Sequence, residues 1–212
     1  MSLLAKVCGL TTAADATFAA AQGADLLGFV SHPLSPRHCA DLSVAEAFAN
    51  RAVLVMVADC GEAVLETAQR HGFQRVQPYL PAVDRERGIA WLRTAGLFVL
   101  LPWADEPGQA VVPADLYLWE PSPAQTGMAG GSGQSHPMAF PPPGPFLLAG
   151  GLDGTNLADR ITALPLEVRP HLRGFDAASR LEAASGVKDP AKVAAFVAAV
   201  RQAASPGKET HD

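Results

Sequence analysis

The chain has 212 residues, of which 49% are hydrophobic and 17% are charged, and its formal net charge is −5 at pH 7. This length and composition are typical of one large α/β domain or two small ones with a substantial core. The basic residues form no stripe along the sequence, so we expect no nucleic-acid partner.

The sequence also lacks membrane-spanning and export signals. The longest strongly apolar runs, such as residues 96–101, are far shorter than the roughly 20 residues that a bilayer requires. Residues 1–6 carry neither a basic start nor a cleavage site, so we expect no membrane partner and a cytoplasmic location. The three cysteines, Cys8, Cys39 and Cys60, are an odd number without short paired spacing, which argues against disulfides and a zinc site.

Short apolar runs alternate with alanine-rich amphipathic segments along most of the chain, a pattern typical of parallel strands joined by helices. The pattern predicts eight strands, at residues 3–8, 24–30, 52–57, 75–77, 97–101, 116–119, 146–149 and 172–176. Helices are predicted at residues 12–22, 44–50, 62–71, 84–94, 156–163 and 190–204. Eight strands with helices between them favour a closed (β/α)8 TIM barrel over an open sheet.

Two connections break this pattern. Residues 102–115 are rich in proline and glycine, and residues 128–145 are poor in helix formers, so we expect the helices after strands five and six to be degraded to loops. The 128–145 loop is long enough to serve as a lid, and a surface excursion without a role is the alternative. We expect one barrel domain over residues 1–204 and a disordered tail over residues 205–212.

Several predicted strands end in short motifs, at the edge where barrels of this type carry their active site. These are Lys-x-Cys-Gly at 6–9, Gly-Phe-Val at 28–30 with Ser-Pro-Arg at 35–37, Ala-Gly-Gly-Leu at 149–152, and Gly-Val-Lys-Asp at 186–189. In this order, and over nearly the whole chain, they resemble the motifs of the phosphoribosylanthranilate isomerase family of tryptophan biosynthesis.

The resemblance implies an Amadori rearrangement of a sugar phosphate. The substrate is N-(5-phosphoribosyl)anthranilate and the product is 1-(2-carboxyphenylamino)-1-deoxyribulose 5-phosphate. The chemistry needs an acid for the furanose ring oxygen, a base for the C2 proton of the Schiff base, a cation for the anthranilate carboxylate and a phosphate cradle. The resemblance implies no cofactor and no metal. The sequence does not determine the oligomeric state.

The resemblance assigns the two catalytic roles to Cys8 and Glu120. Cys8 stands at the cysteine of the opening motif and is the expected base, although on residue type alone a buried structural cysteine is the better interpretation. A thiol with a pKa of about 8.5 needs nearby positive charge or backbone donors to act as a thiolate near neutrality. Glu120 ends "LYLWE" where the family carries an aspartate, and is the expected acid with one extra methylene.

The resemblance also supplies the substrate-binding residues. Arg37 ends the Ser-Pro-Arg motif, and its planar guanidinium suits the anthranilate carboxylate; a solvated loop arginine is the alternative. Asp176 is expected to face the sugar. Gly150 and Gly151 are expected to let the backbone approach the phosphate, and Ser179 to complete the cradle, although paired glycines alone mark no more than a turn.

The chain departs from the family motifs in three places. Arg180 stands where the family has glycine, and it could hinder phosphate, pair with it, or point outward toward Glu182 or solvent. Residues 77–80 read Gln-Pro-Tyr-Leu instead of Gln-Leu-His-Gly, and the fifth strand lacks the family's lysine. These departures put the positioning of the substrate in doubt.

Three alternative interpretations follow from these observations. A diverged barrel could bind a sugar phosphate without catalysing the isomerisation, as the departures suggest. The related bifunctional histidine/tryptophan isomerases use paired aspartates, and Cys8 argues against them. A purely structural role would leave the ordered series of strand-end motifs unexplained.

Overall fold

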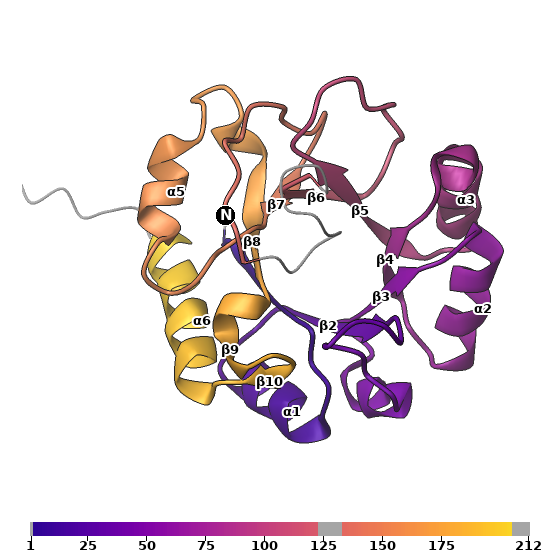
Figure 1. Cartoon of the computed structure of the whole chain (residues 1–212), viewed down its shortest axis with the longest axis horizontal. Coiled ribbons are helices and arrows are strands. Elements are labelled where there is room, and N and C mark those ends of the chain that lie inside the picture. The colour runs from indigo at the N-terminus through magenta and orange to yellow at the C-terminus, as the bar shows by residue number, and fades with distance from the viewer. Residues whose placement is uncertain (1, 123–132, 205–212) are drawn as a thin grey trace, which may run out of the picture.

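The computed structural model describes residues 2–122 and 133–204. Its first eight strands are parallel and pair in sequence order, and β1 closes against β8 to form a barrel (Figure 1). The strands are β1 Leu4–Cys8, β2 Leu26–Ser31, β3 Ala52–Val57, β4 Arg75–Tyr79, β5 Phe98–Ala104, β6 Leu116–Glu120, β7 Phe146–Leu148 and β8 Leu172–Ala177. The prediction of a single (β/α)8 barrel is confirmed, and β4 and β5 extend to residues 79 and 104 rather than 77 and 101.

The helices lie outside the ring of strands (Figure 1). They are α1 Ala13–Ala21, α2 Gly61–Arg70, α3 Ala82–Thr94, α5 Leu157–Ala163 and α6 Pro190–Ala204. The segment expected to be helical at residues 44–50 is instead the 3-10 helix η1, Leu42–Phe48. The amides of Ala49 and Arg51 bond the carbonyls three residues earlier, and this tighter winding suits a short connection.

A second small sheet follows β8 and was not anticipated from the sequence. The 3-10 helix η2, Arg169–His171, precedes β8, and a second one, η3, Ser179–Leu181, follows it. The next two strands form an antiparallel pair: β9, Glu182–Ala184, and β10, Val187–Lys188. Gly186 has φ +80° in the turn between them, a conformation that glycine adopts without strain. This hairpin carries the Gly-Val-Lys-Asp motif and brings Glu182 and Lys188 beside the barrel.

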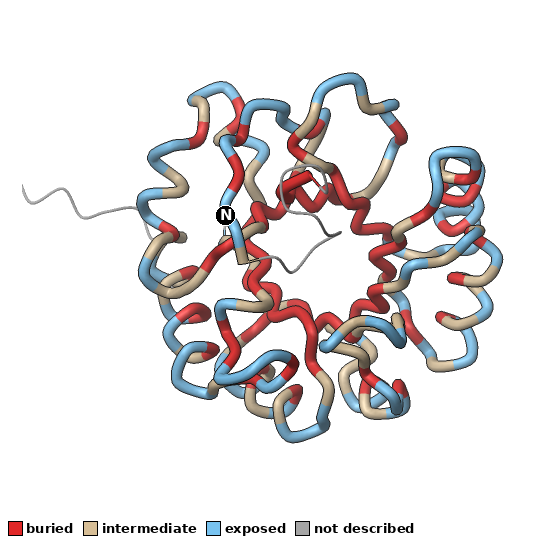
Figure 2. Tube along the Cα trace, viewed as in Figure 1, coloured by how far each residue is buried: buried red, intermediate tan, exposed pale blue. Residues whose placement is uncertain are grey.

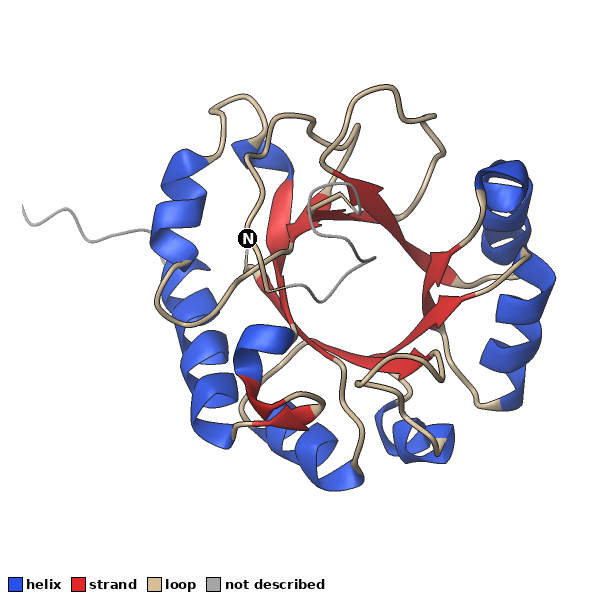
Figure 3. Cartoon of the chain, viewed as in Figure 1, coloured by secondary structure: helices blue, strands red, loops and turns tan. Residues whose placement is uncertain are grey.

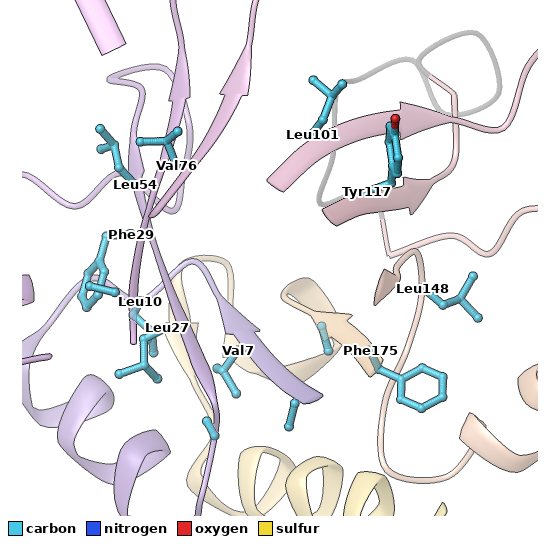
Figure 4. Close-up of a cluster of buried hydrophobic side chains, with 14 of the residues drawn as sticks. Val7, Leu10, Leu27, Phe29, Leu54, Val76, Leu101, Tyr117, Leu148 and Phe175 are labelled. Carbon is cyan, nitrogen blue, oxygen red and sulfur yellow. The ribbon is translucent and has the colours of Figure 1, made fainter. Parts of the chain in front are cut away.

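Alternation along the strands divides the buried side chains into two cores. In β1, Ala5 and Val7 face outward and pack under the helices, whereas Cys8 belongs to the core inside the barrel. Figure 4 shows part of the outer core, to which every strand of the barrel contributes. Figure 2 shows the strands as the most deeply buried part of the chain. A strand therefore delivers every second side chain to the interior, where the site lies.

In the described residues that follow β5 and β6, loops take the place of helices. Residues 105–115 and 133–145 contain no helix, as Figure 3 shows, and residues 123–132 lie outside the described part of the chain. The carboxylate of Asp105 organises this region: Oδ1 accepts hydrogen bonds from Trp119 Nε1 at 3.2 Å and from the Phe140 amide at 2.8 Å. Oδ2 lies 3.2 Å from Nδ1 of the buried His136. A buried polar network thus ties the loop to the outer face of β6.

Some expectations concern residues outside the described ranges. The expected tail at 205–212 and residues 128–132 of the 128–145 loop, including residues 130–132 of its Gly-Gly-Ser-Gly stretch, are among them. Every helix within residues 2–122 and 133–204 is too short or too polar to cross a membrane.

Candidate active site

A cavity opens inside the barrel at the carboxyl ends of the strands. Its lining residues come from six strands, the segment after β2 and the residue after β8: Cys8, Val30, His32, Ser35, Arg37, Val55, Val57, Gln77, Tyr79, Leu118, Glu120, Asp176 and Ala178. Cys8, Arg37, Glu120 and Asp176, which were singled out from the sequence, are thus brought together from positions far apart in the chain.

Cys8 is the last residue of β1 and its side chain is 7% exposed. It lies opposite Gly28 of β2, and a Cβ atom at Gly28 would come within 2.7 Å of the Cys8 sulfur. Burial raises the pKa of the thiol above its ordinary value, and the carboxylate of Asp176 raises it further. The ammonium groups of Lys6 and Lys188 act in the opposite direction. Two cations therefore lie near the thiol and offset part of the rise, but burial outweighs them and the net shift of the thiol pKa is upward.

Lys6 is fully buried inside the barrel, two residues before Cys8 on the same face of β1. Its Nζ atom lies 2.6 Å from Oδ1 of Asp176, its register partner on β8. Burial lowers the pKa of Lys6, but the neighbouring Asp176 and Cys8 raise it above its ordinary value. A buried charge is retained only when it is paired, so Lys6 and Asp176 form a fixed ion pair beneath the thiol.

Glu120 is the last residue of β6 and is 8% exposed. Burial raises the pKa of its carboxyl group to about 8, while a hydrogen bond from Tyr79 acts to lower it. The Tyr79 hydroxyl donates to Oε2 of Glu120 at 3.2 Å, and Gln77 Nε2 donates to the Tyr79 oxygen at 3.0 Å. Glu120 is therefore protonated at neutral pH, as a general acid must be before it reacts.

Arg37 reaches the cavity from the loop after β2, and Glu182 holds it. Its Nε and Nη2 atoms donate to the two carboxylate oxygens of Glu182 at 2.6 and 3.0 Å. Lys188 Nζ donates to the same carboxylate at 3.1 Å. Burial acts to raise the pKa of Glu182, but these two cations lower it below its ordinary value. Gly9, with φ +75°, leaves space for Arg37, because a Cβ there would lie 2.6 Å from Arg37 Cδ.

The expected phosphate-binding residues meet around the backbone of Gly133. Gly150 and Gly151 follow β7 with φ values of +89° and +63°, which favour glycine. A Cβ at Gly151 would lie 2.8 Å from the Gly133 carbonyl, and a Cβ at Gly133 would lie 3.1 Å from Ser179 Oγ. The backbones of the loops after β6, β7 and β8 therefore come together at one side of the barrel mouth.

Arg180 occupies the outer edge of this region. Its Nη1 atom lies 3.2 Å from Oδ2 of Asp153, and its Nε donates to the Gly133 carbonyl at 3.2 Å. The alternative in which Arg180 pairs with Glu182 is wrong, because Arg180 pairs with Asp153 and Glu182 is bound by Arg37 and Lys188. Positive φ does not strain Arg180, since among the described residues other than glycine only Met138 has it.

Known proteins resemble the chain over almost its full length. The isomerase "N-(5'-phosphoribosyl)anthranilate isomerase" of Azorhizobium caulinodans is 36% identical over 220 residues, which cover 96% of this chain and 93% of that protein. The chain belongs to this isomerase family. The protein of the same name from Pseudomonas paraeruginosa is 34% identical, with 92% of this chain and 94% of that protein covered.

Solved structures of the family have the same architecture. The crystal structure of phosphoribosyl anthranilate isomerase from Thermus thermophilus superposes with a TM-score of 0.76 at 26% identity, covering 95% of this chain and all of that chain. No protein-family model matches the chain.

The sequence did not reveal the residues that hold the expected site residues in place. Lys6 opens the Lys-x-Cys-Gly motif, and its spacing of two from Cys8 on a strand was the signal that both face the interior. Glu182 had been considered only as a partner of Arg180. Tyr79 had been treated as a departure from the family, with no signal in the local sequence that it would reach Glu120.

Proposed function

We propose that the chain catalyses the Amadori rearrangement of N-(5-phosphoribosyl)anthranilate to 1-(2-carboxyphenylamino)-1-deoxyribulose 5-phosphate. The observation that carries this proposal is the placement of Cys8 and Glu120 in one cavity, with a neutral carboxyl group and with cations beside the thiol. Family membership supplies the substrate, and the site supplies an acid and a base that match the two proton transfers of the reaction.

In this proposal Glu120 acts first. Its proton goes to the furanose ring oxygen, the bond between C1 and that oxygen breaks, and the nitrogen lone pair forms the C1=N bond of the Schiff base. Cys8, as thiolate, then takes the C2 proton, and the electrons of that bond form C1=C2 while nitrogen becomes neutral. The enolamine tautomerises to the aminoketone. Lys6 and Lys188 stabilise the thiolate before this transfer.

Arg37 is proposed to bind the anthranilate carboxylate. Glu182 holds its Nε and Nη2 atoms, which leaves the Nη1 edge of the guanidinium directed elsewhere, and Arg37 lines the cavity. A fixed guanidinium loses little side-chain entropy when it binds a planar anion. Asp176 is proposed to face the sugar from β8, as its place in the cavity wall allows.

Phosphate is proposed to bind where Gly150, Gly151 and Ser179 meet. The loops after strands seven and eight of such barrels are a frequent phosphate site, and the two glycines expose backbone there. Arg180 adds positive charge at the rim. The reaction as written uses no cofactor and no metal. The absence of a nucleic-acid partner and the cytoplasmic location remain predictions.

Kinetics of two variants test this proposal. We expect Cys8→Ser and Glu120→Gln each to lower kcat by at least about 100-fold, as removal of a general acid or base does. The assay follows the decay of phosphoribosylanthranilate fluorescence. Cys39→Ser is the matched control, because Cys39 is also a buried free thiol but lies in the outer core.

Turnover within a few-fold of wild type in either variant would refute the role of that residue. A wild-type protein that binds the reduced product analogue but leaves substrate fluorescence unchanged would instead support the diverged sugar-phosphate binder.

A further inference from the structure

The carboxyl end of β4 carries a tyrosine whose hydroxyl reaches across the barrel interior to Glu120 of β6. We propose that Tyr79 is a positioning residue for the acid: it holds Oε2 of Glu120 and so directs the acidic proton to Oε1, which serves the reacting atom. This inference rests on the proposed function in that it names the group that controls the same general acid.

The direction of the hydrogen bonds follows from the chain of three side chains. Gln77 is 2% exposed, and its Nε2 donates to the Tyr79 oxygen at 3.0 Å. The amide thus occupies one lone pair of the phenol, whose own proton points to Oε2 of Glu120 at 3.2 Å. Gln77 and Tyr79 are two residues apart on β4, so both side chains face the interior. The strand β4 therefore positions both Gln77 and Tyr79, and their hydrogen bonds lead to the carboxyl group of Glu120.

This arrangement determines which oxygen of Glu120 carries the proton. An oxygen that accepts a hydrogen bond from a phenol is the poorer site for the acid's own proton, so the proton resides on Oε1. Within residues 2–122 and 133–204, Oε1 makes no hydrogen bond, and the residue lines the cavity. Once the proton has been transferred, the Tyr79 hydroxyl donates to the resulting carboxylate and stabilises it.

Electrostatics keep each group in the state that this role requires. Burial, and then the charge of Glu120, raise the pKa of Tyr79 well above its ordinary value, so the phenol remains a donor. Burial raises the pKa of Glu120 to about 8, and the Tyr79 hydrogen bond counteracts that rise. Without the hydroxyl, Glu120 would be a weaker acid.

The lengths of the two side chains match the distance that they span. β4 and β6 are separated by β5, and neighbouring strands lie about 4.8 Å apart, so the two strands are about 9 to 10 Å apart. A tyrosine and a glutamate together cross this distance at 3.2 Å between oxygens. An aspartate would end about 1.3 Å short along its stem. The glutamate and the tyrosine are therefore complementary in length.

The decisive variant is Tyr79→Phe, which removes the hydroxyl and keeps the ring. We expect kcat to fall about 10- to 100-fold, the effect of losing a hydrogen bond to a charged group, with KM nearly unchanged. Tyr117→Phe is the matched control: it is the other tyrosine of the chain, and its buried hydroxyl donates to the Val112 carbonyl at 2.8 Å, in the outer core. We expect this control to retain its kcat.

A second measurement separates this inference from the proposed function. The carboxyl 13C resonance of Glu120, assigned by its loss in Glu120→Gln, is titrated in wild type and Tyr79→Phe. We expect a higher titration midpoint in Tyr79→Phe, and Tyr79→His, which restores a donor, should bring the midpoint back toward wild type. If wild type shows no isomerase activity, the proposed function fails, whereas this titration still decides the role of Tyr79.

A double-mutant cycle completes the test. In the Glu120→Asp background the carboxylate no longer reaches the phenol, so Tyr79→Phe should change kcat less than twofold there. Equal titration midpoints in wild type and Tyr79→Phe, or fully additive effects in the cycle, would overturn the inference. If circular dichroism shows that Tyr79→Phe does not fold, the Glu120 titration is compared between wild type and Tyr79→His instead. A midpoint of Glu120 that differs by two pH units or more between these two proteins would contradict a shared donor role.

Discussion

Glu120 carries a proton in the folded protein over a pH range in which the unfolded chain has lost it. Burial raises the pKa of its carboxyl group from 4.5 to about 8. Between these two values the folded state binds more protons than the unfolded state, so the free energy of unfolding falls as pH rises. The contribution of Glu120 is fully present below pH 4.5 and is lost by the time pH has passed 8.

The magnitude follows from the shift. At about 1.4 kcal/mol per pKa unit, the loss is about 3 kcal/mol at pH 7 and approaches 5 kcal/mol above pH 9. Glu120→Gln removes the titration and keeps the size of the side chain and an acceptor for Tyr79. We therefore expect this variant to gain stability relative to wild type by about these amounts as pH is raised from 4.

Urea unfolding of both proteins at pH 4, 7 and 9 measures this difference, because groups remote from Glu120 titrate equally in the two proteins and cancel. With a urea slope of about 2 kcal/mol per molar, the relative midpoint should move by more than 1 M between pH 4 and pH 7. Glu46→Gln, at an exposed glutamate, is the control and should show no such trend. A difference that does not change with pH would refute the protonated state of Glu120.

Three further predictions concern packing around the site. Gly28→Ala should keep the fold by circular dichroism yet lower kcat on the order of 100-fold, since the new Cβ displaces the Cys8 sulfur by about 1 Å. Lys6→Met should lower the free energy of unfolding by about 3 to 5 kcal/mol in urea titrations, because Asp176 is left buried and unpaired; equal stability would show that the carboxylate is solvated. Asp105→Leu should cost at least about 2 kcal/mol by the same measurement, because the buried Trp119 Nε1 and the Phe140 amide lose their acceptor, and should leave KM unchanged.

Much of the site followed from local features of the sequence. The strand-end position and the family motifs were sufficient to place Cys8 and Glu120 at the active edge of the barrel. The family motifs then selected Arg37 and Asp176, and both line the same cavity. The short 3-10 helix η1 was expected as an ordinary helix, because apolar spacing does not separate these two types over two turns.

The sequence by itself determined that eight strands alternate with covering segments, and that a thiol and a carboxyl group end two of the strands. These properties depend on residues that are close in the chain, so the spacing of apolar residues along the sequence is enough to predict them. Only the tertiary structure decided that Tyr79 holds Glu120, that Lys6 pairs with Asp176, and that Glu182 fixes Arg37. These partners are 41, 170 and 145 positions apart, and closure of the barrel sets which side chains face each other across it.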